Sequence, residues 1–487
     1  MHTPFFSPWR AQLAPMGTRT ARLFRVATSF TLCRLEACFA PWVPADLFPK
    51  ATQNHNSRDR HYTRWRTFWC MLWQALNPLA SGREVVRQLQ ALFDLENLPA
   101  LSPEDGAYCR AKGRLPLPQI GQGLTATAQK ARQLAPACTL LQGRPIKVVD
   151  GSTVALADTP KNRAAYPPVE SGQTPGFPLM RIAVLFCLVS GAVVAVTQAA
   201  WGVGELALLH RLAGEISADD ILIGDRGFGT YPVIAWLRCV LQVDFIGRTP
   251  RRIDGRRRVQ RLGRNDWLVL WEKNASCVSP WLTAVERALL PEPMTLRAVK
   301  GSCFQKGFRA RQVTVVTTLL DPALYPAEEI LRAYLRRWRL EMCLDDLKTT
   351  LHLEFLRSRS PEMAQKEMRL RLMAHNLIRC LMAQSALQHE AALERLSFKG
   401  SLDALRHFTH ALARAHRKTK RRRLWALLLE TLARDQLPER PGRREPRAVK
   451  RKKNKYPRLD APRRQFRDRP KRTLRAKNAR LRRLGLM

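Results

Sequence analysis

The sequence is poor in acidic residues, and this shortage is its most unusual property. It contains 40 Asp and Glu against 83 Lys and Arg, which gives a formal net charge of +43 at pH 7. Residues 448–487 hold 17 of these cations and two Asp, so the body of the chain is strongly basic even without them. A cationic partner is excluded on electrostatic grounds, and a polyanion is expected. Nucleic acid is favoured over an anionic membrane surface.

The 11 cysteines lack the spacing of a metal or redox motif. No two of them form a Cys-x-x-Cys pair, and the nearest two, Cys33 and Cys38, are five residues apart. An odd and unpatterned set in a chain of 487 residues excludes a disulfide framework and a zinc site built on paired cysteines. We therefore expect reduced thiols in a cytoplasmic protein.

Long hydrophobic runs are also scarce, and one segment alone is worth testing as a membrane span. Between Arg181 and Glu205 lie 23 uncharged residues, IAVLFCLVSGAVVAVTQAAWGVG. Ser190-Gly191 in the middle, the many valines and the polar pair Thr197-Gln198 favour two buried strands joined by a tight turn. We expect no contact with a membrane.

The N-terminal part has helical periodicity. Residues 62–95 follow this pattern with a break at Asn77-Pro78, and residues 121–135 continue it. We expect a helical DNA-binding domain over residues 56–140. A basic extension over residues 1–55 precedes it, and its acid-free start resembles a transit peptide, an extended start or a DNA-contacting arm.

From residue 146 onward, short apolar runs alternate with amphipathic segments in the order β, β, β, α, β, α, β. This order predicts an α/β fold with a mixed sheet and flanking helices, whose first part covers residues 141–247. Basic, glycine-bearing, strand-like pieces predict a mostly β insertion over residues 248–320. Helical texture then returns and completes the core over residues 321–400.

The C-terminal part, residues 401–487, is expected to be helical at first and then to become a basic tail. From KTKRRR (418–423) onward the chain is rich in charge, and we expect it to stay disordered until a partner binds.

Two of the apolar runs end in an acid. Asp150 follows IKVV and Asp225 follows ILIG. A strand-end Asp is a common turn or cap residue, so either acid alone would indicate little. A third acid, Glu341, lies in the helical segment YLRRWRLEMCLDDLK (334–348), where steps of about 100° place Tyr334, Arg337, Glu341 and Lys348 on one face.

Three carboxylates that converge repel one another unless a cation lies between them. Hard oxygen ligands of this kind select Mg²⁺ or Mn²⁺. Two such ions can activate an attacking water or 3′-hydroxyl and stabilise the leaving oxygen of a phosphodiester. In so basic a protein, the pattern indicates an enzyme that cuts and joins DNA.

The spacing Tyr334-x2-Arg337-x3-Glu341-x6-Lys348 resembles the Y-R-E-K signature of DDE transposases of bacterial insertion sequences, the class that forms DNA hairpins. The phrases that also resemble this family are VVDGST, IGDRGFGTY, YPAEEILRAYLRRWRLE, LRSRSPEMAQKE, AHNLIR and GAYCRAKGRLP. The resemblance extends from about residue 60 to about residue 385. It implies a ribonuclease-H-like catalytic domain with a mostly β insertion between the second Asp and the Glu.

The resemblance also implies a role for each matched residue. The catalytic acids and ligands of two Mg²⁺ ions, for which Mn²⁺ can substitute, would be Asp150, Asp225 and Glu341. The residues expected to bind DNA are Tyr334, Arg337, Lys348, Arg226 and Trp338. An aromatic side chain of the insertion would hold a flipped base during hairpin formation, and the candidates are Trp267, Trp271 and Trp281.

The implied partners are the terminal inverted repeats of a mobile element and target DNA, bound by a homodimer in the bacterial cytoplasm at the nucleoid. Two other functions stay open: a host DNA nuclease on the same scaffold without strand transfer, and a basic nucleic-acid-binding relic that no longer cuts.

Plainer interpretations exist for the individual residues. Arg337 and Glu341, four residues apart on a helix, can form an ordinary surface ion pair. Asp345 and Asp346 share that helix, and either could be mistaken for the third acid, although the spacing of the motif prefers Glu341. Tryptophans more often belong to the core than to a binding platform. The histidines expected to be structural are His210 and His375.

Overall fold

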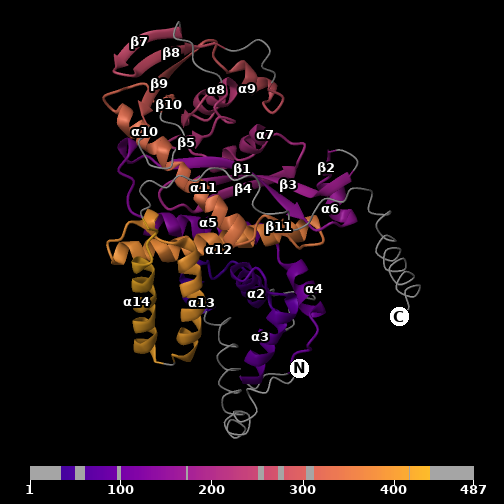
Figure 1. The fold of residues 1–487 in the computed structure, drawn as a ribbon. Coiled ribbons are helices and arrows are strands. Elements are labelled where there is room, and N and C mark those ends of the chain that lie inside the picture. Colours follow the sequence, from indigo (N-terminus) through magenta and orange to yellow (C-terminus); the bar gives the residue numbers. More distant parts are fainter. Residues whose placement is uncertain are drawn as a thin grey trace, which may run out of the picture.

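The computed structural model describes residues 35–49, 61–95, 100–171, 174–250, 257–272, 279–302, 312–415 and 417–438 (Figure 1). Residues 1–34 and 439–487, which contain most of the predicted N-terminal extension and most of the basic tail, lie outside the described residues. A large mixed sheet with many helices around it confirms the predicted α/β class.

The sheet has the strand order β2-β3-β1-β5-β6-β10-β9-β8-β7, with β4 beside β3 and β11 beside β1. The strands outside the expected insertion are β1 (Ile146–Leu156), β2 (Pro168–Ser171), β3 (Thr174–Cys187), β4 (Val193–Ala200), β5 (Ile221–Gly224), β6 (Asp244–Gly247) and β11 (Phe355–Leu356). Strand β3 runs antiparallel to its two neighbours β1 and β4, whereas β5 and β6 run parallel to β1.

The uncharged segment forms the β3–β4 hairpin, as predicted. The turn between the strands contains Gly191, whose φ of +69° is strained for residues with a Cβ. The Arg379 guanidinium would lie 2.6 Å from a Cβ at this position. In the part of the chain that the structure describes, no helix has the length and hydropathy needed to cross a bilayer.

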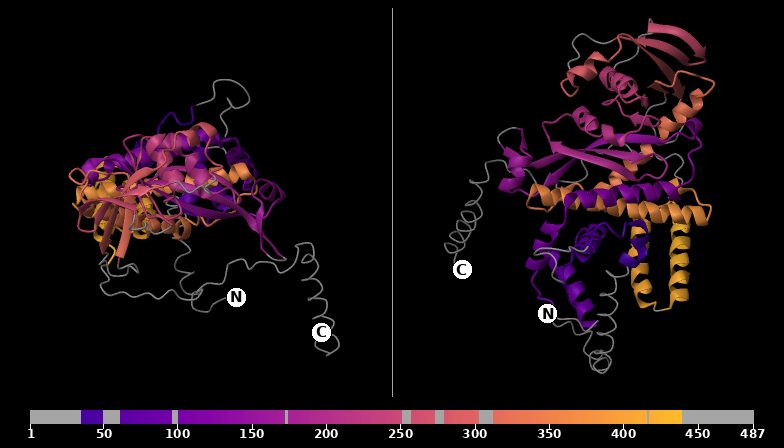
Figure 2. Two further views of the ribbon diagram at one scale, coloured as in Figure 1. Left: turned by 90° about the horizontal axis from the view of Figure 1, so that it is seen from above. Right: turned by 180° about the vertical axis from the view of Figure 1, so that it is seen from behind.

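Helices cover both faces of the sheet because the strands alternate their side chains between two apolar clusters. Val148 and Val154 of β1 belong to a cluster shared with α5 (Leu117–Leu134) and α12 (Pro361–Gln388). Val149 belongs to the cluster shared with α7 (Glu205–His210) and α8 (Tyr231–Cys239). Helices α5 and α12 cross beneath the sheet in both side views (Figures 1 and 2).

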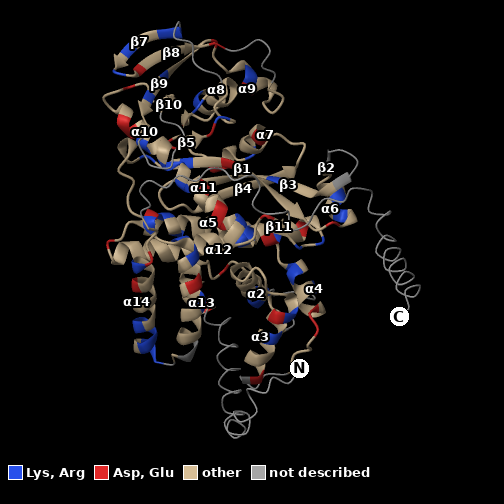
Figure 3. Cartoon of the chain, viewed as in Figure 1, with Lys and Arg blue, Asp and Glu red and all other residues tan. Residues whose placement is uncertain are grey.

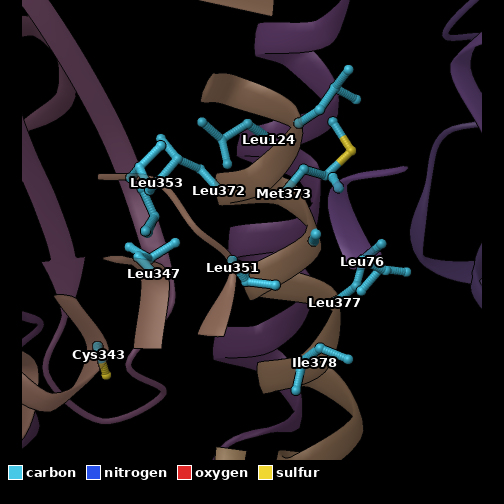
Figure 4. Close-up of a cluster of buried hydrophobic side chains, with 14 of the residues drawn as sticks. Leu76, Leu124, Cys343, Leu347, Leu351, Leu353, Leu372, Met373, Leu377 and Ile378 are labelled. Carbon is cyan, nitrogen blue, oxygen red and sulfur yellow. The ribbon is translucent and has the colours of Figure 1, made fainter. Parts of the chain in front are cut away.

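Helix α12 is the centre of the larger cluster. Figure 4 shows its Leu372, Met373 and Leu377 beside Leu124 of α5 and Leu76 of α2 (Arg64–Leu76). Burial of so many large apolar side chains, each contributing about 1.5–3 kcal/mol, holds the N-terminal helices against the core.

Polar side chains of α12 fix it to the β3–β4 hairpin. Asn376 accepts a hydrogen bond from Val193 N at 2.7 Å and donates one to Val193 O at 2.9 Å. His375 lies 3.0 Å from Gly191 O, and burial lowers its pKa to about 3. His375 is therefore a neutral structural residue, as expected.

The predicted helical periodicity of residues 62–95 corresponds to α2 and α3 (Gly82–Leu95). The break falls at Asn77, whose backbone N–H caps α2 and whose side chain donates to Trp73 O. Helix α4 (Gly106–Arg114) packs on α2, and α5 packs along α12. Further short helices among the described residues include η2 (Ala40–Trp42), η3 (Leu141–Gly143), α6 (Pro160–Ala165), η4 (Ala213–Glu215) and η7 (Leu393–Arg395).

The expected insertion contains β7 (Arg258–Gly263), β8 (Asp266–Trp271), α9 (Ala284–Ala288), β9 (Met294–Ser302) and β10 (Gln312–Thr317). It continues the core sheet, since Val316 of β10 pairs with Gly247 of β6 in antiparallel register. A buried ion pair, Arg297–Asp266 at 2.6 Å, stabilises it. His210 binds Glu286 of α9 at 2.9 Å, which is a structural role as expected.

The C-terminal described part is a hairpin of α13 (Phe398–Arg414) and α14 (Lys418–Arg434). The expectation of disorder from KTKRRR onward is wrong for residues 417–438. This segment folds because the helix that begins at Lys418 buries Leu428, Leu429 and Leu432 against the core.

Candidate active site

Strand register brings the two strand-end aspartates together. Strands β1 and β5 pair in parallel up to Val148 and Ile223, and the same register continued by two residues places Asp150 beside Asp225. The register of β5 and β6, which pairs Gly224 with Gly247, likewise places Arg248 beside Asp225. Three charged residues therefore form one row across adjacent parallel strands.

The row lies on the face of the sheet that α12 covers. Val148, Ile223 and Ile246, two positions earlier on the three strands, all belong to the cluster that contains α12. Side chains two residues apart on a strand share a face, so the charged row faces the segment before α12.

The steps of about 100° assumed one regular helix over residues 334–348. This assumption is wrong, because the segment that faces the row is divided into three parts. It consists of α10 (Ala327–Arg336), α11 (Trp338–Asp345) and the π-helical turn η6 (Asp346–Thr350). Arg337 lies at the junction, where its N–H binds Tyr334 O at 3.1 Å. Leu351 N binds Asp346 O at 3.0 Å, a bond over five residues that rotates this last turn relative to a regular helix.

Arg337 is the centre of the site. Its Nη2 donates to Glu341 Oε1 at 2.8 Å, and its guanidinium carbon lies 5.7 Å from the centre of the Tyr334 ring. Its pKa is raised, since burial, which lowers it, is outweighed by the nearby Tyr334, Glu341 and Asp150. The Nε of Arg337 is buried without a hydrogen-bond partner among the described residues. An unsatisfied buried N–H of this kind can receive an anionic oxygen.

Asp150 lies within electrostatic reach of both other acids. Burial is the main reason why the pKa of Asp150 is raised to about 6, and the negative charges of Asp225 and Glu341 add to this rise. The hydrogen bond from Gly151 N and the positive charge of Arg337 oppose it. One oxygen of Asp150 accepts from Gly151 N at 2.8 Å. The structure therefore brings Asp150, Asp225 and Glu341 into one electrostatic group.

Tyr334 belongs to the same group. Burial raises the pKa of its hydroxyl; Arg337 and Arg248 oppose this rise and Asp225 adds to it. Arg248 was missed in the sequence, although it follows the strand VDFIG just as the two acids follow their strands. The strand-end criterion that selected Asp150 and Asp225 would have found it.

Other predicted residues lie apart from this group. Lys348 is half-buried in the π-helical turn and forms no ion pair within the described part of the chain. Arg226 is exposed in the turn after β5. Trp338 is 49% exposed and lines a separate groove together with Leu335 and Arg339.

The two rival acids of the helix do not join the group. Asp345 is exposed. Asp346 is half-buried; burial raises its pKa to about 7, the nearby Arg379 lowers it, and Asp345 adds to the rise. Neither acts on Asp150 as Glu341 does, so the geometry favours Glu341 as the third acid.

The tryptophans of the insertion pack against the second apolar cluster. Trp271 meets Tyr231 edge-on at 5.9 Å, and Trp281 meets Trp236 at 5.6 Å. Trp267 lies under the Arg258 guanidinium at 4.2 Å. Trp271 and Trp281 are thus part of the packing, while Trp267 faces a cation.

The donor set of the site suits a divalent cation. Three carboxylates outnumber the two arginines of the group, Arg337 and Arg248, and all three supply hard oxygens. Within the described ranges, no three His, Cys, Asp or Glu side chains are already gathered at metal-binding distances. Glu341 would have to exchange Arg337 for the cation.

Comparison with known proteins shows which proteins the chain is similar to. Residues 141–377 match the family described as the transposase DDE domain. The chain is 25% identical over 399 residues to the transposase InsG of insertion sequence element IS4 from Escherichia coli (strain K12), which covers 80% of this chain and 85% of that protein. It is 28% identical over 190 residues to the transposase of insertion sequence element IS421 from Escherichia coli, covering 33% of this chain and 51% of that protein.

A solved structure of the piggyBac transposase synaptic complex with hairpin DNA covers 84% of this chain and 85% of its own, at 12% identity and a TM-score of 0.35. None of the eight cysteines that the structure describes is part of a disulfide. Residues 141–377 thus match the transposase DDE domain family, and the chain as a whole is similar to transposases of Escherichia coli insertion sequences.

Proposed function

We propose that this transposase binds the terminal inverted repeats of its own insertion sequence, cleaves DNA at each end and transfers the 3′-hydroxyl ends to target DNA. The observation that carries the proposal is the strand register that puts Asp150 beside Asp225, together with the influence of Asp225 and Glu341 on the pKa of Asp150. These acids come from two strands and a helix that are far apart in sequence. Folding of the apolar core does not require acids to converge, so their convergence indicates a functional site.

Asp150, Asp225 and Glu341 would hold two Mg²⁺ ions, or Mn²⁺ in their place. Bound there, the ions would supply Lewis acidity to the attacking and leaving oxygens of the phosphodiester. The protein contributes the fixed strand-end positions of the two aspartates and a helix turn that presents Glu341. It also contributes the partial burial that keeps water from screening these charges.

Cationic side chains beside the acids would hold the DNA backbone. Arg337 can direct two N–H groups at one phosphate, and its free buried Nε supports that role. Arg248 and the Tyr334 hydroxyl lie next to Asp225 and would bind the neighbouring phosphate. Lys348, Arg226 and Trp338 are further DNA-binding candidates at the edge of the site.

The order of the core strands supports a ribonuclease-H-like catalytic domain. Three antiparallel strands, β4, β3 and β1, are followed across the sheet by the parallel strands β5 and β6. The Y-R-E-K spacing supports a hairpin intermediate, with Trp267 as the best-placed insertion residue for a flipped base. A homodimer that pairs two ends completes the proposed synaptic complex in the bacterial cytoplasm.

The matched pair Glu341→Ala and Asp345→Ala tests the proposal on a labelled duplex that carries an element end. Glu341→Ala should abolish Mg²⁺-dependent strand cleavage and keep gel-shift binding, whereas Asp345→Ala should cleave at the normal rate. Cleavage by Glu341→Ala at the normal rate would refute the assignment. Loss of cleavage in both would indicate damage to the helix.

The competing host-nuclease function is separated by the product. A pre-cleaved end with a labelled 3′-hydroxyl is incubated with plasmid and Mg²⁺. Joined products support a transposase, nicked plasmid without joined label supports the nuclease, and no product at all supports the non-catalytic relic.

A further inference from the structure

A dense group of cations occupies the start of α14. We call it the α14 tip, and its members are Arg417, Lys418, Lys420, Arg421, Arg422 and Arg423. All six side chains are exposed or half-exposed. In Figure 3 this end of the helix is blue, and in Figures 1 and 2 it lies at the far end of the α13–α14 hairpin, away from the sheet.

The charges of the α14 tip are not neutralised by the protein. The first turn of α14 contains no acid, and the nearest acid along the helix is Glu430, which pairs with Arg434 instead. None of the six cations forms an ion pair with another described residue. Those in the first turn also lie at the positive end of the helix dipole, which disfavours cations. An anionic partner at this position would relieve both repulsions.

The hairpin presents its tip rigidly. Leu428 and Leu429 are buried, Ser385 Oγ of α12 donates to Leu429 O at 2.6 Å, and Trp425 meets Trp42 edge-on at 6.3 Å. Lys418 is ten residues before Leu428, so the helix carries its first turn about 15 Å beyond this anchor. The cations are thus held on a fixed support that stands clear of the core.

The distribution of the cations selects one class of partner. Successive steps of about 100° spread Lys418, Lys420 and Arg421–Arg423 around the whole circumference of the helix. A helix that lies on a membrane needs an apolar face for insertion. Here the first apolar residues, Leu424 and Trp425, are half-buried, and Leu427 is the one large exposed apolar side chain among the described residues of α14. A highly charged phosphate backbone fits a tip that is cationic on every side.

We propose that the α14 tip binds the phosphate backbone of double-stranded DNA, independently of sequence and outside the catalytic group. This inference rests on the proposed function only in taking DNA as the partner. The bound DNA would be a segment distant from the cleaved phosphodiester, such as the flank of an element end or the target duplex.

The experiment measures how salt affects the affinity of the full chain for a 30-bp duplex of unrelated sequence. The tip variant changes Lys420, Arg421, Arg422 and Arg423 to Gln. The matched control removes the same charge from exposed cations elsewhere, by changing Arg132, Arg211, Arg264 and Lys300 to Gln. Each lost phosphate contact lowers the slope of log K against log salt by about 0.9. We expect the tip variant to lose about 2 to 3.6 slope units and the control to lose less than about 1.

Two further variants protect the test against misfolding. Replacement of Arg421–Arg423 by Lys keeps the charge and should keep the slope. Lys418→Glu with Lys420→Glu puts acids at the helix start, which favours the helix, and should still weaken DNA binding. The fold of each is checked by circular dichroism and melting.

Three results would overturn the proposal: equal losses in the tip variant and the control, normal DNA binding with lost binding to phosphatidylserine vesicles, or normal DNA binding with a changed oligomeric mass. Cleavage at saturating DNA should be unaffected by the tip variant. A failure of the proposed catalytic function would instead show as cleavage that Glu341→Ala does not alter, so the two failures are distinguishable.

Discussion

Arg337 and Glu341 form an ion pair across one helical turn, with Arg337 Nη2 2.8 Å from Glu341 Oε1. The side chain of Arg337 is 16% exposed and that of Glu341 is 36% exposed. The spacing of four residues alone predicts such an ion pair on a helix. Here both members of the pair also influence the pKa of a third residue, Asp150. Arg337 lowers the pKa of Asp150 and Glu341 raises it, so the pair balances the charge beside the strand-end acid.

Replacement of Arg337 by Ala should impair catalysis through Asp150 as well as through phosphate binding. The Asp150 pKa would rise further, because Arg337 is a cation that lowers it. We expect cleavage at pH 7 to fall by about 100-fold and the acidic limb of the pH–rate profile to move to higher pH. Arg337→Lys should keep the limb in place. Arg336→Ala, on the outer side of α10, is the control, and a profile that does not move in Arg337→Ala would contradict the electrostatic part.

Asp150 should destabilise the metal-free protein above pH 6. Burial raises its folded pKa from 3.8 to about 6, so the folded state disfavours the ionised form. The penalty is absent below pH 3.8, grows between the two values and is complete above about pH 6, where it amounts to about 2 to 3 kcal/mol. Asp150→Asn should therefore melt at a higher temperature than the wild type at pH 8 in EDTA, and the difference should shrink at pH 4.5. A lower melting temperature at pH 8 would contradict this.

Arg248 should be needed for cleavage, although the sequence motif does not include it. It lies beside Asp225 and acts on the Tyr334 hydroxyl. Arg248→Ala should lower the cleavage rate at saturating DNA by about 10- to 100-fold, because a phosphate contact made in the transition state is lost. Arg211→Ala, on an exposed helix end, is the control. An unchanged cleavage rate in Arg248→Ala would show that Arg248 does not take part in cleavage.

Gly229 should not tolerate a side chain. A Cβ there would lie 1.8 Å from the backbone oxygen of Arg248, so the end of β6 would have to move. We expect Gly229→Ala to cost about 2 kcal/mol or more of unfolding free energy and to reduce cleavage. Gly121→Ala is the matched control, since no atom lies within 4 Å of its Cβ and Ala favours the interior of α5 by about 0.5–1 kcal/mol. Urea unfolding of the two variants measures the contrast, and equal stability would contradict the packing.

Arg297 and Asp266 should behave as a unit. Arg297 is fully buried, binds both oxygens of Asp266 at 2.9 and 2.6 Å, and donates to Tyr325 O at 2.7 Å just before α10. Arg297→Met leaves a buried unpaired carboxylate and should cost about 3–5 kcal/mol. Arg297→Met with Asp266→Leu should recover part of that loss in urea unfolding. A double variant as unstable as the sum of the single ones would show that the pair is not coupled.

Local rules in the sequence selected the candidate acids. Asp150 and Asp225 were selected because a short apolar run followed by an acid indicates a strand end, and Glu341 because of its spacing from the other residues of the motif. The structure places Asp150 beside Asp225, and the catalytic role of the three acids stays a prediction. Arg248 was missed, since its place in the row depends on the register of β5 and β6, and register is a long-range property. The break in the helix has no local signal either, because β-branched residues, Gly and Pro are absent from residues 334–348.

The rest of the fold was predicted in outline. The alternation of strand and helix patterns correctly predicted the mixed sheet. The helix that starts in KTKRRR was not predicted, because it is stabilised by leucines that pack on α12, whereas the charge of its first residues indicated disorder. Trp338 was expected next to Arg337 because they adjoin in sequence. Side chains of neighbouring residues on a helix point about 100° apart, so the side chain of Trp338 points into a separate groove.

The pairing of β10 with β6 bears on attempts to shorten this protein. Without the insertion, the last parallel strand would present a bare row of amide and carbonyl groups, which is a template for intermolecular association. A shortened chain that joins residue 247 directly to residue 318 would therefore expose the edge of β6 and be prone to aggregation, so the inserted strands protect the sheet from association.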